Sequence, residues 1–367
     1  MATYRIALIP GDGIGPEIMN EAVKVIETVS RVYVEPQFEL EPIGAGATRF
    51  LETGVTMPQS DYELCTQAHA MLMGAIGLPH ARRADGTEVA GEVIFRLRFG
   101  LDLFAGVRPV RLLPNVRSPL RDVSAGIDYV VVRENVEGLY ASRDGGTKVR
   151  DEVATDTMVI TREGTQKIVN YAFKLAQKRS GRPLDGKSMV TCVDKSNVLA
   201  SYAFFRSVFD DVAAGYPDVG RDYAYVDAMT LYQVLSPQNY DVVVSENMFA
   251  DIISDLSSAT VGGLGVAPSG DVGERYGLFQ PAHGSAPTIA GQGIANPVAM
   301  ILSTAMMFDW LADQHNDEAA RRAGLAITGA VESALGDKSS LTPDLGGTMS
   351  TKGFGDAVVA AMRTAAE

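Results

Sequence analysis

The stretch IPGDGIGPEI, residues 9–18, decides whether the chain begins with a dinucleotide-binding loop of the usual kind. That loop needs glycines at its first, third and sixth positions, but here they stand at the first, third and fifth, as Gly11, Gly13 and Gly15. Pro16 and Glu17 suit the first turn of a helix, where proline loses no hydrogen bond and an acid faces the positive helix end. The stretch therefore predicts a turn from a strand into a helix, and a cofactor site must lie elsewhere.

The composition predicts a globular protein with room for two domains. The chain has 367 residues, 46% of them hydrophobic, and a typical domain holds about 100 to 200 residues. No apolar run approaches the roughly 18 residues of a membrane span, and the start MATYRIALIPGDG lacks the pattern of a signal peptide, so the expected location is the cytoplasm. A formal charge of −13 opposes binding to nucleic acid or acidic membranes. With only two cysteines and four scattered histidines, any metal would be held by oxygen atoms.

Apolar, β-branched runs alternate with helical patterns along the chain. The candidate strands are 129–132, 189–193 and 240–245, and the candidate helices are 161–179 and 197–213. Strands that alternate with helices indicate an α/β fold with a largely parallel sheet covered by helices. The segment 143–161 alternates like β structure around Gly145 and Gly146, which predicts an exposed hairpin arm suited to pairing with another subunit.

Arginines concentrate in and after the stretch FRLRFGLDLFAGVRPVR, residues 95–111. They are Arg96, Arg98, Arg108, Arg111 and, after a later strand, Arg133. Planar guanidinium groups bind carboxylates through paired hydrogen bonds, so converging arginines predict a site for a di- or tricarboxylate. The alternative is a set of solvated surface arginines, the usual environment of this side chain.

The segment NMFADIISDLSSA, residues 247–259, predicts a helix that carries two acids one turn apart, Asp251 and Asp255. Two like charges at this spacing repel unless a positive group lies between them. Mg²⁺ or Mn²⁺ suits ligands that are all oxygen, and Asp227 is a candidate for the third carboxylate. The alternative is a solvated acidic face. The same pattern turns four apolar residues towards the core, Phe249, Ile252, Ile253 and Leu256.

Three further segments carry candidate functional groups. Lys195 follows an apolar strand in CVDKSNVL, where a metal and partial desolvation would lower its pKa and allow it to act as a general base. Tyr140, in RENVEGLYA, is either a packing aromatic or a proton donor. The loop 280–297 surrounds His283 with small residues and backbone amides, which suits a flat ligand such as adenosine. Each of these segments taken alone is also typical of an ordinary loop.

Nine segments in this order carry a resemblance that covers nearly the whole chain. They are IPGDGIGPE, GAIGLP, LRFGLDLFAGVRPVR, VVRENVEGLY, DKSNVL, YVDAMTL, NMFADIISDL, HGSAPTIAGQGIANP and LTPDLGG. Together they resemble the isopropylmalate and isocitrate dehydrogenase family, the metal-dependent β-decarboxylating hydroxyacid dehydrogenases. The resemblance implies that the chain is an enzyme of this class.

The resemblance implies roles for the matched polar residues. The substrate's malate part would be held by Arg98, Arg108 and Arg133. The metal would be held by Asp251 and Asp255 of one subunit and by Asp227 of the partner subunit, which also contributes Lys195. Lys195, with Asp227, would take the proton of the 2-hydroxyl group as hydride leaves for the nicotinamide, and Tyr140 would protonate the enolate after decarboxylation. The active site would therefore be shared within a homodimer.

The resemblance also implies a fold and a cofactor site. The fold would be the family's three-layer α/β fold, which is not a Rossmann fold. A discontinuous cofactor domain would comprise 1–103 and 262–367, and 104–261, with the arm 143–161, would serve dimerisation and catalysis. The adenosine side of the cofactor would contact His283, Gly284, Ser285, Ala286, Ile289 and Asn296.

Two departures from the family's patterns bear on cofactor and substrate. Thr288 stands where relatives that use NAD commonly have an acid, and the Lys-Tyr pair of NADP-dependent isocitrate dehydrogenases is absent, so NAD is favoured over NADP. Mg²⁺ or Mn²⁺ is the expected metal, and K⁺ is a further cation that the resemblance allows. Ile94 and Phe95 stand where isopropylmalate enzymes present apolar residues to the substrate's isopropyl group, and the serine and asparagine typical of isocitrate enzymes are absent.

The best expectation is therefore oxidative decarboxylation of 3-isopropylmalate. A tartrate or D-malate dehydrogenase is the second hypothesis, because the sequence around Arg96 also resembles that branch. Residue types alone leave this choice open, since one methylene in an apolar pocket changes discrimination by only about 1 to 3 kcal/mol. A third hypothesis is a noncatalytic regulatory subunit. Such a chain would be expected to lack Lys195, Tyr140 or the carboxylates, and all of them are present.

Overall fold

The computed structural model describes residues 3–33, 35–143 and 145–366, and its contacts divide the chain into two compact units. Unit 1 comprises 1–101, 113–117 and 262–367, and unit 2 comprises 102–112 and 118–261. In both units most neighbouring strands are parallel, which confirms the predicted α/β class. The segment 113–117 packs in unit 1, although the sequence analysis assigned it to the second domain, because the Asn115 amide donates to the carbonyls of Leu335 and Gly336.

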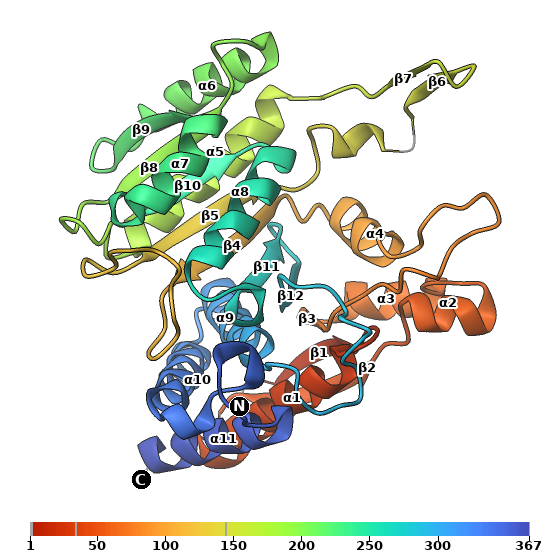
Figure 1. The fold of residues 1–367 in the computed structure, drawn as a ribbon, viewed down its shortest axis with the longest axis vertical. Coiled ribbons are helices and arrows are strands. Elements are labelled where there is room, and N and C mark those ends of the chain that lie inside the picture. Colours follow the sequence, from red (N-terminus) through yellow and green to blue (C-terminus); the bar gives the residue numbers. More distant parts are fainter. Residues whose placement is uncertain (1–2, 34, 144, 367) are drawn as a thin grey trace. The chain divides into compact units, whose positions relative to one another are not determined.

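In unit 1 the strands follow the order β2-β1-β3-β12-β11, in which β11 and β12 are antiparallel and the other neighbours are parallel (Figure 1). These strands are β1 (Thr3–Ile9), β2 (Gln37–Pro42), β3 (Ala70–Met73), β11 (Pro268–Val272) and β12 (Gly277–Pro281). The helices are α1 (Gly15–Val32), α2 (Ala47–Thr53), α3 (Gln59–Gln67), α4 (Glu92–Gly100), α9 (Val298–His315), α10 (Glu318–Gly336) and α11 (Thr351–Ala366). The largely buried helix α9 contacts β11, β12, α1 and α10, so it forms the centre of this unit's core.

The glycine-rich stretch at 9–18 connects β1 to α1, as its sequence predicted. Pro16 lies at the start of α1, and Glu17 is the acid of its first turn. Asp12 is 1% exposed, and its carboxylate accepts hydrogen bonds from three backbone amides, those of Ala47 (2.8 Å), Thr48 (2.7 Å) and Gly77 (2.8 Å). Because the carboxylate of Asp12 already accepts hydrogen bonds from these amides, they are not available to bind a phosphate. The loop therefore has a structural role.

In unit 2 the strands follow the order β4-β5-β10-β8-β9, in which β4 and β5 are antiparallel and the other neighbours are parallel (Figure 1). These strands are β4 (Ala105–Arg111), β5 (Asp128–Glu134), β8 (Met189–Asp194), β9 (Gly220–Tyr225) and β10 (Val242–Ser245). The helices are α5 (Arg162–Lys178), α6 (Ala200–Ala213), α7 (Val226–Leu235) and α8 (Asn247–Thr260). The helix predicted over 161–179 is α5, with Thr161 as its N-cap, whereas the helix predicted from 197 begins only at Ala200.

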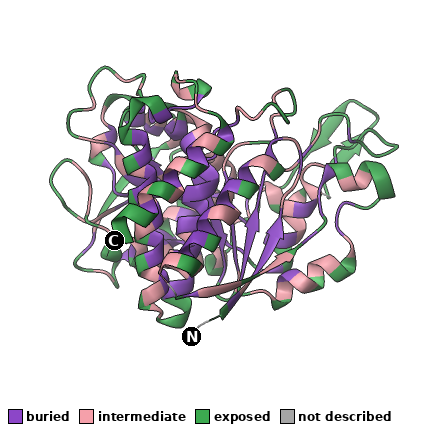
Figure 2. Cartoon of the chain, turned by 90° about the horizontal axis from the view of Figure 1, so that it is seen from below, coloured by how far each residue is buried: buried purple, intermediate pink, exposed green. Residues whose placement is uncertain are grey.

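Helices cover the sheet of unit 2 in two pairs. Successive side chains of a strand point to opposite faces, and Val131 and Val243 pack with Ala250 and Ile253 of α8 in one buried cluster. The pair α5 and α6 contacts strands β5, β8 and β10 as well. Buried residues accordingly follow the strands and the inward side of the helices (Figure 2). The carboxyl ends of the parallel strands β5, β8 and β10 lead directly into the segments that carry Tyr140, Lys195 and α8.

Strands β6 (Thr147–Val149) and β7 (Val153–Thr155) form an exposed antiparallel hairpin inside the predicted arm. Its turn lies at Arg150 and Asp151, whose φ angles are 52° and 57°, so the predicted turn at Gly145 and Gly146 is wrong. Two successive residues with positive φ are typical of the tight turns that match the twist of a hairpin. Asp144, which also belongs to the predicted arm, lies outside the described residues.

No helix in the described part of the chain combines the length and the apolar composition needed to cross a membrane.

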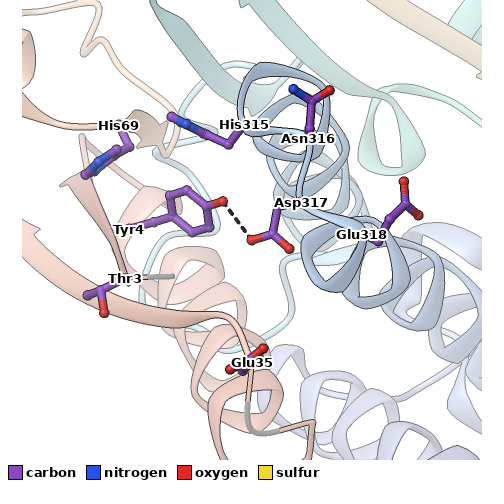
Figure 3. Close-up of a pocket in the computed structure, with 8 residues that line it drawn as sticks. All are labelled: Thr3, Tyr4, Glu35, His69, His315, Asn316, Asp317 and Glu318. Carbon is purple, nitrogen blue, oxygen red and sulfur yellow. Dashed lines mark hydrogen bonds between the residues drawn. The ribbon is translucent and has the colours of Figure 1, made fainter. Parts of the chain in front are cut away.

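An aromatic pocket of about 440 Å³ lies in unit 1 beside Tyr4, His69 and His315 (Figure 3). The hydroxyl of Tyr4 donates to Asp317 (2.8 Å), and the ring of Tyr4 lies 5.5 Å from that of His69 and 5.2 Å from that of His315, between ring centroids. Nδ1 of His69 accepts a hydrogen bond from the backbone amide of Arg5 (2.9 Å), which requires the neutral imidazole. Burial and the charge of His315 lower the pKa of His69 below its ordinary 6.5.

This environment predicts a loss of stability in mild acid. The unfolded chain takes up the His69 proton at a higher pH than the folded chain does, so the free energy of unfolding falls as the pH drops below about 6.5 and levels off below the folded-state pKa. His69→Asn keeps a hydrogen-bond acceptor but removes this titration. We expect its unfolding midpoint in urea to fall less than that of wild type between about pH 7 and pH 5. His80→Asn, at an exposed site, is the control; equal pH dependence of all three proteins would contradict the prediction.

Candidate active site

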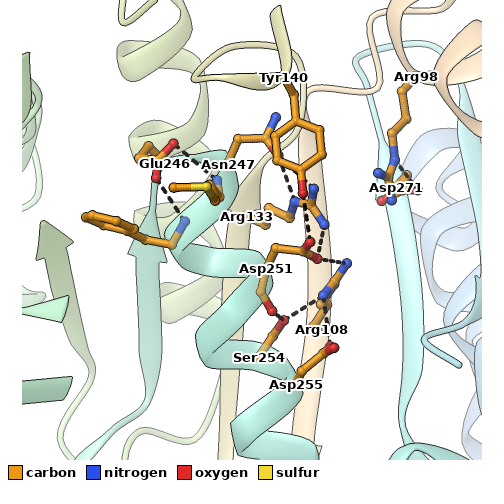
Figure 4. Close-up of polar contacts among 12 residues, drawn as sticks. Arg98, Arg108, Arg133, Tyr140, Glu246, Asn247, Asp251, Ser254, Asp255 and Asp271 are labelled. Atoms are coloured by element: carbon orange, nitrogen blue, oxygen red, sulfur yellow. Dashed lines mark hydrogen bonds and ion pairs between the residues drawn. The ribbon is translucent and has the colours of Figure 1, made fainter. Parts of the chain in front are cut away.

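Asp251 of α8 is the centre of a polar cluster within unit 2 (Figure 4). Its carboxylate accepts from the guanidinium of Arg108 (3.0 Å), forms an ion pair with Arg133, and accepts from the hydroxyl of Tyr140 (3.1 Å). The guanidinium of Arg133 also lies over the ring of Tyr140, 5.2 Å from its centroid. The fold thus brings together the predicted substrate arginines of this unit, the predicted proton donor and a predicted metal ligand.

Asp255 lies one turn further along α8 and faces the same arginine. Its carboxylate is 3.6 Å from Nη1 of Arg108, and that nitrogen donates to the hydroxyl of Ser254 (2.6 Å). Partial burial raises the pKa of Asp255, and the charge of Asp251 acts in the same direction while Arg108 opposes it. The two acids therefore lie close enough to repel each other, and arginine supplies the positive charge beside them.

The predicted helix over 247–259 is confirmed, but one residue of its predicted buried face is wrong. The helix spans Asn247–Thr260, and Ile253 is fully buried, whereas the neighbouring Ile252 is 55% exposed. The buried face of α8 consists mostly of small residues, namely Ala250, Ser254, Ser257 and Ser258 together with Ile253. Serine hydroxyls that bond to their own helix can be buried without large apolar neighbours. A prediction based only on the positions of apolar residues therefore places the buried face of α8 incorrectly.

Lys195 and Asp227 form a second charged group in unit 2. Lys195 follows β8 and Asp227 lies in the first turn of α7, and their side chains make an ion pair. The hydrogen bond from Lys195 is the main reason why the pKa of Asp227 lies below its ordinary value. The ammonium also lies 5.9 Å from the ring centroid of Tyr225. Within the described chain, Lys195 makes no ion pair with the carboxylates of α8.

The remaining substrate-side candidates belong to α4 in unit 1. Arg98 is 6% exposed and donates to Asp271 (3.0 Å). Phe95 stacks with Phe99 at 6.0 Å between centroids, and Ile94 beside it is half-buried. Arg98 is therefore held by a buried partner in its own unit, an interaction that the sequence analysis did not predict.

The cofactor candidates line a pocket of about 390 Å³ in unit 1. His283, Gly284, Ala286, Ile289 and Asn296 all border it. Nδ1 of His283 bonds to the carbonyl of Gly284 (2.9 Å), and its buried Nε2 has no hydrogen-bond partner. Burial also lowers the pKa of His283, so the imidazole remains neutral. A neutral, unpartnered acceptor beside apolar walls suits an amino group on a flat heteroaromatic ring.

Ser285 packs against the opening turn of the chain, whereas its neighbours Gly284 and Ala286 border the pocket. Its side chain is 6% exposed, its hydroxyl donates to the carbonyl of Gly77, and its own carbonyl accepts from the amide of Ile14 (2.9 Å). A Cβ on Gly13 would collide with Ser285, and Gly13 has a positive φ of 57°. Ser285 therefore fastens the predicted cofactor loop to the opening turn of the chain.

The acidic groups fit part of a magnesium or manganese site. Asp251 and Asp255 provide hard oxygen donors on one helix face, as these ions prefer. In the described part of this single chain, no three histidine, cysteine or acidic side chains form a group able to hold a metal ion. A complete oxygen-ligand set therefore needs a donor beyond the two acids of α8.

Two acidic residues near these sites were not predicted from the sequence. Glu134, 2% exposed at the end of β5, accepts from the amides of Val136 (2.8 Å) and Glu137 (2.7 Å), and burial raises its pKa to about 7. Asp344 borders the cofactor pocket and accepts from Asn296 (2.9 Å). An acid directly after an apolar strand is a detectable signal for Glu134. Asp344 stands in the segment LTPDLGG, but that segment alone does not show that Asp344 borders a pocket formed by distant parts of the chain.

Comparisons with known proteins agree on one family. The family model described as isocitrate/isopropylmalate dehydrogenase matches residues 5–358. The chain is 40% identical to a 3-isopropylmalate dehydrogenase of Clavibacter michiganensis over 99% of each chain. It is 39% identical to a 3-isopropylmalate/3-methylmalate dehydrogenase of Methanocaldococcus jannaschii over 95% of this chain and 96% of the relative. The crystal structure of isocitrate dehydrogenase from Methylococcus capsulatus matches with a TM-score of 0.84 and 34% identity, over 98% of this chain and 99% of that one.

Proposed function

Because the chain belongs to the isocitrate and isopropylmalate dehydrogenase family and is a decarboxylating dehydrogenase, we propose that it oxidises 3-isopropylmalate with NAD and a divalent metal ion. The observation that carries this proposal is the cluster in which Asp251 meets Arg108, Arg133 and Tyr140. It combines cations for the substrate carboxylates, an oxygen donor for a metal and a hydroxyl group for proton transfer. The cytoplasm is the proposed location.

An apolar substrate side chain is supported by the arrangement of α4. Ile94 and Phe95 offer partly buried apolar surface. Arg96, which favoured a tartrate or D-malate enzyme, bonds to the carbonyl of Met57 (2.6 Å) and to Gln59 (2.5 Å) and lies over the ring of Tyr62. Its charge is thus engaged with α3 and its surroundings. Tartrate or D-malate remains the second candidate substrate, since it shares the malate frame that the other arginines would hold.

The residues of the chain can divide the chemistry among them. Lys195, with Asp227 beside it, takes the proton of the substrate's 2-hydroxyl group. NAD, if bound in the pocket beside His283, would supply the hydride acceptor. Arg108 and Arg133, with Arg98, hold the substrate carboxylates by charge-assisted hydrogen bonds. Tyr140 donates a proton to carbon after carbon dioxide has left. A metal held by Asp251, Asp255 and Asp227 would supply Lewis-acid stabilisation of negative charge on oxygen.

The cofactor proposal rests on the pocket beside His283. Its unpartnered Nε2 can accept a hydrogen bond from the amino group of adenine, and a Cβ on Gly284 would meet no atom within 4 Å, so that loop leaves open space. Thr288 is uncharged, and the carboxylate of Asp344 on the pocket wall would repel a ribose phosphate. These features favour NAD over NADP. K⁺ remains a further cation to test.

The proposal includes a homodimer in which each site uses residues of both subunits. Leu231 and Leu235 of α7 and Ile252 of α8 are 53%, 66% and 55% exposed, although α7 and α8 pack together. Exposed apolar residues that gather on neighbouring helices are typical of protein interfaces. A partner subunit that covers this surface could also bring its Lys195 and Asp227 to the cluster around Asp251. The arm 143–161 is proposed to pair with the same partner.

The test is an assay for reduced nicotinamide with purified protein, Mn²⁺ and K⁺. The acids are 3-isopropylmalate, D-malate, the tartrates and isocitrate, each with NAD or NADP. We expect turnover of 3-isopropylmalate with NAD, and loss of that turnover with EDTA until Mn²⁺ is restored. A preference for D-malate or tartrate would replace the proposed substrate. Silence with every acid, despite Mn²⁺ binding in calorimetry, would instead favour a noncatalytic regulatory subunit.

A further inference from the structure

Asn247, in the first turn of α8, bonds to both the predicted substrate arginine and the segment that carries the predicted proton donor. Its Oδ1 accepts from Nε (3.0 Å) and Nη2 (2.7 Å) of Arg133, and its Nδ2 donates to the carbonyl of Glu137 (3.0 Å). We propose that Asn247 is a positioning residue that orients Arg133 towards the substrate and fixes the segment leading to Tyr140. This inference rests on the proposed function, because it assigns those two residues their roles.

The geometry of α8 gives Asn247 this place. Residues four apart lie above one another on a helix, so Asn247, Asp251 and Asp255 form one row on the same face of α8 (Figure 4). The row divides the donors of Arg133, since Nε and Nη2 face Asn247 while Nη1 faces Asp251. The side chain of Arg133 is 3% exposed, so its orientation is set by these protein partners and not by water.

A neighbouring acid leaves the Asn247 side chain available for this role. An asparagine at a helix start commonly caps the helix, but here Glu246 is the cap and accepts from the amides of Met248 (3.1 Å) and Phe249 (2.9 Å). The segment before Tyr140 crosses directly above the helix start at Gly138, where a Cβ would lie 2.6 Å from Glu246 and 3.1 Å from the Cβ of Asn247. The amide of Asn247 therefore meets the arginine on one side and this segment on the other.

The neutrality of the amide is the second part of the proposal. A carboxylate at this position would accept from Arg133 equally well but would offset its charge and repel the carbonyl of Glu137. An amide accepts from the arginine, donates to the carbonyl and adds no second carboxylate, besides that of Asp251, to compete with a substrate carboxylate for Arg133. Asparagine is thus the residue type that satisfies both contacts without adding a third acid to the row of Asp251 and Asp255.

The experiment compares Asn247→Ala and Asn247→Asp with Ser245→Ala. Ser245 is a matched control, because it is fully buried on the neighbouring strand end and its hydroxyl donates to the carbonyl of Val193 (2.7 Å). Steady-state kinetics would give kcat and the KM values for the acid and for NAD, and crystal structures of the same proteins would give the conformation of Arg133. Thermal unfolding measures any general loss of stability.

We expect Asn247→Ala to raise the KM for the acid on the order of tenfold or more, with the KM for NAD unchanged and Arg133 displaced. Asn247→Asp should keep Arg133 in place and still raise the KM for the acid, while Ser245→Ala changes neither. An unchanged KM for the acid in Asn247→Ala, with Arg133 in its original position, would overturn the positioning role. An unchanged KM in Asn247→Asp would overturn the argument from neutrality.

The proposed function and this inference can fail separately. If wild type turns over none of the acids, the proposed function fails, and the crystal structures then decide the inference. Displacement of Arg133 in Asn247→Ala but not in Ser245→Ala would support the positioning role, and an unmoved Arg133 would overturn it. If Asn247→Ala does not fold, Asn247→Ser replaces it, because the shorter side chain cannot reach both Arg133 and the carbonyl of Glu137. A displaced Arg133 with a raised KM for the acid would support the positioning role, and an unmoved Arg133 with an unchanged KM would overturn it.

Discussion

Replacement of Lys195 by methionine should lower kcat by about 10³-fold, because a general base typically contributes 10²- to 10⁴-fold to a rate. Methionine keeps the length of the side chain but cannot take a proton from the substrate's 2-hydroxyl group. It also removes the hydrogen bond that lowers the pKa of Asp227. The carboxylate is then left alone to take the proton, and even at its ordinary pKa it is a weak base for an alcohol. The measurement is the steady-state rate of NAD reduction with 3-isopropylmalate and Mn²⁺.

Lys187→Met is the matched control for this prediction. The side chain of Lys187 is 69% exposed and lies 3.4 Å from the carboxylate of Asp185, so it too belongs to an ion pair with an acid, but at the surface. Surface ion pairs contribute little to stability, and we expect the activity of this variant to equal that of wild type. If Lys195→Met retained more than about a tenth of the wild-type rate, the role of Lys195 as the base would be wrong.

Two inactive variants should restore activity when they share a dimer. In the proposed homodimer one site uses the α8 acids of one subunit and the Lys195–Asp227 pair of the other. A heterodimer of Lys195→Met with Asp251→Asn then contains one site with both defects and one intact site. We expect the heterodimer, purified through two different affinity tags, to have about half of the wild-type rate. The homodimers of Lys195→Met and of Asp251→Asn should each have only the low rate predicted above for Lys195→Met.

A second heterodimer controls for this result. Lys195→Met combined with Asp227→Asn places one defect in each site, because both residues are proposed to act in the partner's site. We therefore expect no gain over the homodimers. Equal activity of the two heterodimers would contradict the shared site, and so would a monomeric wild type in sedimentation experiments. Full activity in a monomer would also remove the reason to regard the exposed face of α7 and α8 as an interface.

The parts of the fold that follow from local pattern were predictable from the sequence. Runs of β-branched residues gave the strands around Val131 and Val243, and the N-cap Thr161 marks the start of α5. Local pattern failed where tertiary context decides. The hairpin turn forms at Arg150 and Asp151 with positive φ, although glycines adopt that conformation more easily and lie nearby.

The candidate site was predictable in its charged residues but not in the contacts that hold them. Arg133, Asp251 and Tyr140 could be recognised because they stand in the motifs VVRENVEGLY and NMFADIISDL, and the fold brings them into contact. Asn247 was not predicted. A polar residue at a helix start is commonly a cap, and only the structure shows that Glu246 has that role here. The partner of Arg98, Asp271, lies 173 residues away in sequence, and no local pattern identifies such a pair.

The row formed by Asn247, Asp251 and Asp255 has a consequence for how substrate preference can change. A helix rises about 1.5 Å per residue, so the two ends of the row are about 12 Å apart along a rigid axis. In the proposed site, Asn247, which holds Arg133, and the two proposed metal ligands therefore belong to one rigid element, whose spacing is unchanged by substitutions elsewhere in the chain. If the proposed roles are correct, a change of preference among malate-type acids is expected to arise from residues outside α8, such as Ile94 and Phe95 of α4. Evolutionary change in this protein would then alter the residues that contact the variable substituent of the substrate and conserve the residues that bind its malate part.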